Sequence, residues 1–325
     1  RQGVIDMFTA VTWQDWLAAG AQKRDIIVKA ITEYKGSADF QTALLAQDYF
    51  RGDNPEIRQK TMLKAHKIEE KDERGKVTYK PIVRKEISGS RIPNGFFFRF
   101  VTQENQHLLS NGVILEDSAL KERLGNGFDK TLERMGEKAL VQGVCWGYWN
   151  MDHLEPIPAA SDQSSGMVVL LDEISSEPMV GIQFWRLSPD KPMVVRVFEP
   201  DGLTIYAEDE NGQLYEREPK RAYKQTVSRD AAGAMLVDAE NYAALPLVPL
   251  WANEEHMSEL TQSIKAKIDA YDRIFSDFGD NLARANDVYW VLNNFGGSVS
   301  QIMETMEWIN TLKTVVAQTD GMGGG

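Results

Sequence analysis

The residues best suited to chemistry are four carboxylates on a helical stretch near the end of the 325-residue chain. Asp269 and Asp272 are three residues apart, and so are Asp277 and Asp280. Residues three apart lie on one face of a helix, so each pair could hold Mg²⁺ for hydrolysis in a nuclease. Three cations lie among them: Lys265, Arg273 and Arg284. Because these cations can neutralise the carboxylates, the pattern favours a charged helix face over a metal site.

Other catalytic arrangements are absent from the sequence. The histidines are dispersed and show no zinc spacing; they are His66, His107, His153 and His256. The single cysteine, Cys145, lies among aromatic residues and is predicted to be a small buried apolar side chain. The chain has no Gly-x-Ser-x-Gly elbow and no Walker loop, and Gly125-Asn-Gly reads as a helix break. We predict no enzyme activity, no catalytic residue, no cofactor and no bound metal.

The composition is typical of a soluble globular protein, with 42% hydrophobic and 26% charged residues and no apolar run long enough to cross a membrane. The net charge of −12 argues against tight DNA binding by the bulk surface, because phosphate binding needs a basic face. The chain begins at Arg1 with no signal-like segment, so we expect a part of a longer intracellular protein.

Apolar residues along the same helical stretch recur in steps of four and three. This spacing predicts a narrow seam that packs against a neighbouring helix. Its members are Ile264, Ile268, Tyr271, Phe275, Phe278 and Leu282. Arg273 and Asp277, and likewise Asp280 and Arg284, are spaced to pair within the helix. The alternative is a solvated, coiled-coil-like helix without a partner.

The remaining chain alternates between helical and strand patterns. Residues 12–50 and 95–143 have helical periodicity, whereas 143–250 has the shorter period of antiparallel strands. The charge-rich segment 64–89 is predicted to be a mobile, solvated loop, and 299–316 an amphipathic helix. A sheet region set between helical regions predicts the α+β class.

Several short motifs, in this order, resemble the portal proteins of tailed bacteriophages, in the branch typical of siphophages. They are Pro249-Leu-Trp-Ala-Asn, Ser258-Glu-Leu, Ile268-Asp-Ala-Tyr-Asp, Ser276-Asp-Phe and Val288-Tyr-Trp-Val-Leu-Asn-Asn-Phe-Gly-Gly. The resemblance implies a portal fold with a wing over 1–250, a stem helix over 251–287 and the start of a clip over 288–325. The wing would combine the helices of 12–50 and 95–143 with the sheet of 143–250. The family's second stem helix and crown would follow and are absent from this sequence.

The resemblance also implies a function. Portal proteins form a ring, expected here to be a dodecamer, at a capsid vertex of the virion after assembly in the host cytoplasm. Double-stranded DNA passes through the ring without sequence recognition during packaging and ejection. The implied partners are the terminase large subunit, head-tail connector or adaptor proteins, and capsid and scaffold proteins, with no membrane. The alternatives are a metal-dependent DNA-processing nuclease and a minor capsid or adaptor protein.

Two further sets of residues receive expected roles from this resemblance. Tunnel-facing or inter-subunit charges are expected at Lys265, Asp269, Asp272, Arg273, Asp277, Asp280 and Arg284. A clip face that contacts partners is expected at Gln301, Glu304, Glu307, Asn310 and Lys313.

Overall fold

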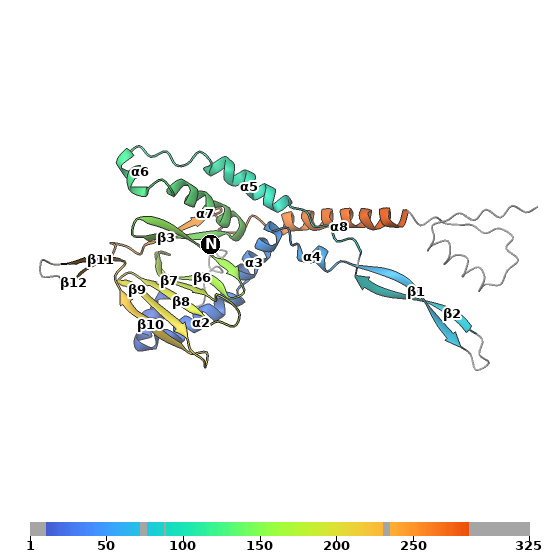
Figure 1. Ribbon diagram of the computed structural model, residues 1–325, viewed down its shortest axis with the longest axis horizontal. Coiled ribbons are helices and arrows are strands. Elements are labelled where there is room, and N and C mark those ends of the chain that lie inside the picture. The colour runs from blue at the N-terminus through green and yellow to red at the C-terminus, as the bar shows by residue number, and fades with distance from the viewer. Residues whose placement is uncertain (1–10, 72–76, 88, 230–234, 286–325) are drawn as a thin grey trace, which may run out of the picture. The chain divides into compact units, whose positions relative to one another are not determined.

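The computed structural model describes residues 11–71, 77–87, 89–229 and 235–285 (Figure 1). The chain divides into two compact units. Unit 1 contains Arg1–Gln59 and Pro93–Tyr271, and unit 2 contains Lys60–Ile92 and Asp272–Gly325. The boundary between the units falls inside one long helix, α8, which spans Gln262–Ala285.

Unit 1 begins with helices whose ends are fixed by their own side chains. They are α1 (Trp13–Ala18), η1 (Gly20–Gln22), α2 (Lys23–Gly36), α3 (Ala38–Phe50) and α4 (Pro55–Arg58). Thr12 and Asp15 form a capping box at the start of α1, and Ser37 caps α3 directly after α2 ends. The helical periodicity predicted over 12–50 is therefore confirmed, with the break at Gly36-Ser37.

A six-stranded antiparallel sheet in the order β10-β9-β8-β7-β6-β5 forms the centre of unit 1. Its strands are β5 (Ala160–Asp162), β6 (Ser165–Leu171), β7 (Pro178–Trp185), β8 (Val194–Glu199), β9 (Gly202–Glu208) and β10 (Leu214–Arg221). Trp16, Ile27 and Phe40 of the first helices pack on Ile182 and Phe184 of this sheet in one buried cluster. Figure 1 shows α2 along this sheet.

A second sheet has the order β13-β3-β4, with β3 at Val144–Asn150, β4 at His153–Pro158 and β13 at Leu247–Trp251. Trp146 and Tyr148 of β3 share a buried cluster with Met167 and Phe198 of the larger sheet. The free Cys145 is fully buried, and burial raises its pKa to about 12, so its predicted role as an apolar side chain is confirmed.

Unit 1 also contains three further helices: α5 (Phe96–Leu109), α6 (Ser118–Leu124) and α7 (Phe128–Gln142). α5 and α7 lie side by side, as Figure 1 shows. β11 (Lys224–Arg229) and β12 (Met235–Glu240) form a hairpin that pairs with no other strand in the described part of the chain. The mixture of helices with antiparallel sheet confirms the α+β class.

Unit 2 contains an antiparallel hairpin where the sequence predicts a mobile loop, so that prediction is wrong. β1 (Thr61–Lys71) pairs along its whole length with β2 (Val77–Ile87). The segment has many charged residues, but Val, Ile, Tyr and Thr recur between them. These residue types favour extended backbone, and a hairpin tolerates charge at alternate positions. Among the described residues, no helix is long and apolar enough to cross a membrane.

Candidate functional site

The segment 252–261, which connects β13 to α8, is hydrogen-bonded to the end of α7 and fixes the start of α8. The Ala252 amide donates to the Gly143 carbonyl, and the Ser258 hydroxyl donates to the Val141 carbonyl at 2.6 Å. Gly143 has φ +90°, and a Cβ there would lie 2.6 Å from the His256 carbonyl oxygen, so glycine is needed. The Thr261 hydroxyl then accepts from the Ile264 amide at 3.3 Å. Helix α8 therefore begins at Gln262. Residues 252–261 form the hydrogen-bonded connection to α7 and are not part of the helix.

The first carboxylate of α8 is neutralised within unit 1. Asp269 accepts a short hydrogen bond from the Tyr49 hydroxyl and forms an ion pair with Lys265 at 2.7 Å. Lys265 also lies 3.4 Å from Glu56. Burial lowers the pKa of Lys265, but Asp269 and Glu56 outweigh this effect and hold that pKa above its ordinary value. Lys265 and Asp269 thus make contacts inside their own chain.

Two later carboxylates of α8 are neutralised within unit 2 by one lysine. The Nζ atom of Lys60 lies 2.7 Å from Asp277 and 3.2 Å from Asp280. Asp280 also accepts the Ser90 amide at 2.8 Å. The side chains of Lys60 and Asp280 are only 10% and 11% exposed. Each charge is therefore largely removed from water and needs the other to offset the free-energy cost of its burial. The partner of Asp277 is therefore Lys60 rather than Arg273, the pairing that the spacing along the helix suggested.

The same contacts fix the base of the β1–β2 hairpin to α8. The Ile92 amide donates to the buried Ser276 hydroxyl at 2.9 Å, and Lys60 directly precedes β1. A Cβ at Gly279 would lie 3.0 Å from the Ser90 hydroxyl, so the chain passes close to the helix at this point. Both ends of the hairpin are thus attached to one side of α8.

Replacing Lys60 with Met should lower stability locally by roughly 1–3 kcal/mol, because Asp280 would lose its buried cation. Hydrogen exchange at the Ser90 and Ile92 amides measures the effect, and faster exchange is expected at both. Lys29→Met is the control, since Lys29 and Glu33 form an exposed pair worth under about 0.5 kcal/mol. Equal exchange in the two variants would contradict the assigned role of Lys60.

The apolar seam predicted along α8 divides into a buried part and an exposed part. Ile268 is buried among Tyr49, Phe97 and Leu140, and Ile264 packs against the same cluster. Tyr271 contacts the Phe96 ring edge-on, with the ring centres 4.7 Å apart. The first part of the seam therefore packs within this chain, not against another helix of the same kind.

The later part of the seam is exposed to solvent in the single chain. Phe275 is 46% exposed, Phe278 64% and Leu282 60%, and Ile274, which the sequence analysis missed, is 66% exposed. A strict alternation of three and four selects about one residue per turn, so the wider apolar stripe that includes Ile274 was overlooked. Large exposed apolar patches mark interaction sites. We name Ile274, Phe275, Phe278 and Leu282 the apolar face of α8.

The other predicted charged residues of α8 and the predicted clip face do not form a site among the described residues. Asp272 is almost fully buried and Arg273 is exposed. The side chain of Arg284 lies outside the described residues, as does the predicted clip face, Gln301, Glu304, Glu307, Asn310 and Lys313. Among the described residues, no group of three or more His, Cys, Asp or Glu side chains is placed to hold a metal ion. The carboxylates that suggested Mg²⁺ are in part occupied by Lys60, Lys265 and Tyr49.

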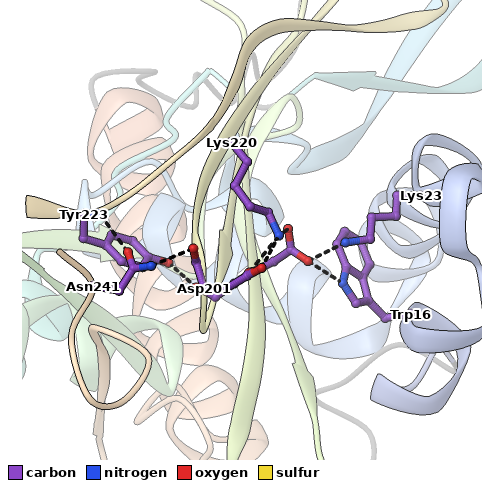
Figure 2. Close-up of polar contacts among 7 residues, drawn as sticks. Trp16, Lys23, Asp201, Lys220, Tyr223 and Asn241 are labelled. Carbon is purple, nitrogen blue, oxygen red and sulfur yellow. Dashed lines mark hydrogen bonds and ion pairs between the residues drawn. The ribbon is translucent and has the colours of Figure 1, made fainter. Parts of the chain in front are cut away.

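Unit 1 also has a buried polar centre that the sequence analysis missed (Figure 2). Glu199, at the end of β8, is 5% exposed and receives the indole N–H of Trp16 at 3.0 Å. Its carboxylate lies 2.6 Å from Lys23 and 2.8 Å from Lys220. Burial raises the pKa of Glu199, but these three hydrogen bonds outweigh burial and hold it below its ordinary value.

Contacts from this centre continue to the base of the β11–β12 hairpin. Lys220 also pairs with Asp201 at 2.7 Å, and the Asp201 carbonyl accepts from the side chain of Asn241. Tyr223 donates its hydroxyl to the Glu199 carbonyl at 2.7 Å, as Figure 2 shows. No local spacing relates these residues, so only the folded chain brings them together.

Comparison with known proteins identifies the family. The family model described as "Phage portal protein, SPP1 Gp6-like" matches residues 31–324. The portal protein of Clostridium phage phiCD119 is 21% identical over 257 residues, which cover 72% of this chain and 53% of that protein. The chain thus spans about half the length of this relative. The match covers most of the described residues, including all of α8, and the chain belongs to the SPP1 Gp6-like family of phage portal proteins.

Proposed function

We propose that the full-length protein forms a closed ring at a capsid vertex and serves as the conduit for double-stranded DNA during packaging and ejection. The observation that carries this proposal is the apolar face of α8. Its large side chains are exposed in one chain, while the carboxylates Asp269 and Asp280 are satisfied by the same chain. In a head-to-tail ring, every copy offers the same face to a neighbour, and rotation closes the ring without free edges.

The domain roles follow from this proposal. Residues 1–250 would form the wing, α8 the stem, and 288–325 the start of the clip. The helices and antiparallel sheet described within residues 11–250 support the assignment of a mixed helical and sheet wing. We further propose a dodecamer, in the virion at the capsid vertex and in the host cytoplasm during assembly.

The proposed mechanism is steric and electrostatic, not chemical. DNA must pass through the ring without binding tightly to its wall. An acidic wall repels the phosphates at close range, and salt at about 0.15 M screens this repulsion beyond roughly 8 Å. The net charge of −12 supports this role. Of the predicted cations whose side chains the structure describes, Arg273 is exposed, whereas Lys265 pairs with Asp269 and Glu56. We therefore assign weak tunnel or inter-subunit contacts to Arg273 first.

The proposed partners are the terminase large subunit, head-tail connector or adaptor proteins, and capsid and scaffold proteins. We place the contact with terminase and connector on the clip face defined above, whose polar residues could serve two successive partners. Reversing charge at Glu304 and Glu307 tests this placement through packaging and tail joining. Ring assembly should not change, because rim charges mainly alter encounter and specificity.

A structural ring protein should not cleave DNA. Native mass spectrometry of the full-length protein, with a cleavage assay in Mg²⁺, separates the ring from a nuclease and from a minor capsid or adaptor protein. We expect a ring mass and no cleavage above background, because Lys60 and Lys265 already neutralise α8 carboxylates. Magnesium-dependent cleavage that Asp272→Ala abolishes would overturn the proposal and favour the nuclease.

A further inference from the structure

Two half-exposed phenylalanines lie on opposite flanks of α5. Phe98 is 47% exposed and Phe100 is 50% exposed. Because each residue of an α-helix turns by about 100°, side chains two residues apart point in nearly opposite directions. Phe97, which precedes Phe98, is buried in a core cluster of unit 1. Helix α5 therefore presents one exposed aromatic ring on each side of its buried stripe.

Each exposed ring packs on a second ring that is fixed to the core. Phe98 contacts Phe50, at the end of α3, with the ring centres 5.1 Å apart. Phe100 stacks on Phe96, with the ring centres 6.1 Å apart. Phe50 and Phe96 both pack against the same buried cluster, which includes Tyr49. We name Phe50 with Phe98 the α3–α5 pair, and Phe96 with Phe100 the α5 pair. Rings already held in place lose little conformational freedom on binding, so both pairs are suited to a defined contact.

The α5 pair continues into the apolar face of α8. The exposed Tyr271 lies edge-on against Phe96, with the ring centres 4.7 Å apart. Phe275 follows Tyr271 by four residues within the same helix, so the two side chains share one side of α8. Any partner that covers the apolar face of α8 therefore reaches the α5 pair through Tyr271.

The apolar face of α8 is small for a stable contact by itself. At about 200 Å² for each large apolar side chain, its four residues expose roughly 500 Å². Each partner in a standard protein–protein interface buries about 800 Å². A stable contact between copies thus needs further apolar surface, and the α5 pair with Tyr271 supplies surface next to this face.

We propose that the α5 pair of one copy docks on the α3–α5 pair of the next copy of this chain. A head-to-tail contact needs two different patches that face different ways, and the two aromatic pairs meet this requirement on the flanks of one helix. Aromatic rings pack favourably on one another edge-to-face or offset. A copy of the chain is favoured over another apolar partner, because each copy brings one patch of each kind. This inference rests on the proposed ring and extends its contact from α8 to α5.

The first test blocks each patch separately in the full-length protein, with Phe98→Asp in one variant and Phe100→Asp in the other. The control, Leu108→Asp, adds the same charge at a 64% exposed position near the other end of α5. Mass photometry over a range of protein concentrations measures the concentration at which half of the subunits are assembled. We expect it to rise by roughly tenfold or more in each blocked variant, because an unpaired carboxylate would be buried at the contact. The control should change it little.

A mixture of the two blocked variants tests the direction of the contact. The Phe98→Asp subunit keeps its α5 pair, and the Phe100→Asp subunit keeps its α3–α5 pair, so together they can form one intact contact. The outer patches of such a pair are both blocked, so we expect heterodimers and no rings. Native mass spectrometry with one variant isotope-labelled measures the heterodimer. A mixture with no more dimer than either variant alone would overturn the proposed pairing.

The outcomes separate this inference from the proposed ring. If the wild-type protein never assembles, the proposed ring itself fails. If the wild type assembles and either blocked variant matches the Leu108→Asp control, the ring stands and the inference is wrong. If thermal unfolding shows that Asp disturbs the subunit, Phe98→Ser and Phe100→Ser are judged by the same criteria.

Discussion

Replacing Glu199 with Gln is expected to lower the free energy of unfolding by about 3 kcal/mol, because two ion pairs lose their shared carboxylate at a buried position. Lys23 and Lys220 would then face a neutral amide, and the Trp16 indole would keep at most one weaker acceptor. The Glu199 carboxylate joins four elements, since these residues come from α1, α2, β8 and β10.

The same carboxylate should make stability depend on pH. The pKa of Glu199 is lower in the folded chain than in the unfolded chain, so its contribution is complete above the unfolded value of about 4.3. That contribution is lost as pH falls through the folded pKa. Between about pH 7 and pH 3, the wild type should therefore lose more stability than the Glu199→Gln variant.

Urea unfolding at both pH values measures these effects, and Asp201→Asn is the matched control. Asp201 also pairs with Lys220, but its side chain is 70% exposed, so its loss should cost under about 1 kcal/mol. If Glu199→Gln costs no more than Asp201→Asn, Glu199 does not hold the N-terminal helices on the sheet.

Replacing Phe278 and Leu282 with Ser is expected to abolish ring assembly in the full-length protein while each subunit stays folded. Both side chains are mostly exposed in the single chain, so their loss should cost the monomer little. If both become buried between copies, the variant loses about 3–6 kcal/mol per interface, which weakens association by a hundredfold or more.

Analytical ultracentrifugation measures assembly, and circular dichroism measures folding. Ile174→Ser with Leu187→Ser is the control, because these apolar side chains are 96% and 88% exposed and lie away from α8 in the sequence. The control should assemble like the wild type. Normal rings from the Phe278 and Leu282 variant would show that this face is not part of the contact between copies.

Local periodicity was sufficient to predict much of the fold. The helices within 12–50 and 95–143, the antiparallel strands and the burial of Cys145 depend on residues close in sequence. The β1–β2 hairpin was not predicted, because a high density of charged residues favours a loop, although the spacing of Val, Ile and Tyr permits strands. In this segment the composition favours a loop and the periodicity permits strands. The pairing of β1 with β2, which local sequence does not show, makes the segment a hairpin.

The candidate site was predictable only in part. The apolar spacing identified α8, but it could not show that Ile268 packs inside the chain while Phe278 is exposed. That difference depends on Tyr49 and Phe97, which come from distant parts of the sequence. The partners of the carboxylates were missed for the same reason: Lys60 is far from Asp280 in sequence and reaches it only in the folded chain. Charge pairs between distant segments have no sequence periodicity.

Electron microscopy of the purified full-length protein tests the central claim most directly. The account predicts closed rings with a central hole, viewed end-on, and a uniform number of subunits around that hole. Particles that remain single subunits or open filaments, at protein concentrations where the subunit is folded, would contradict it.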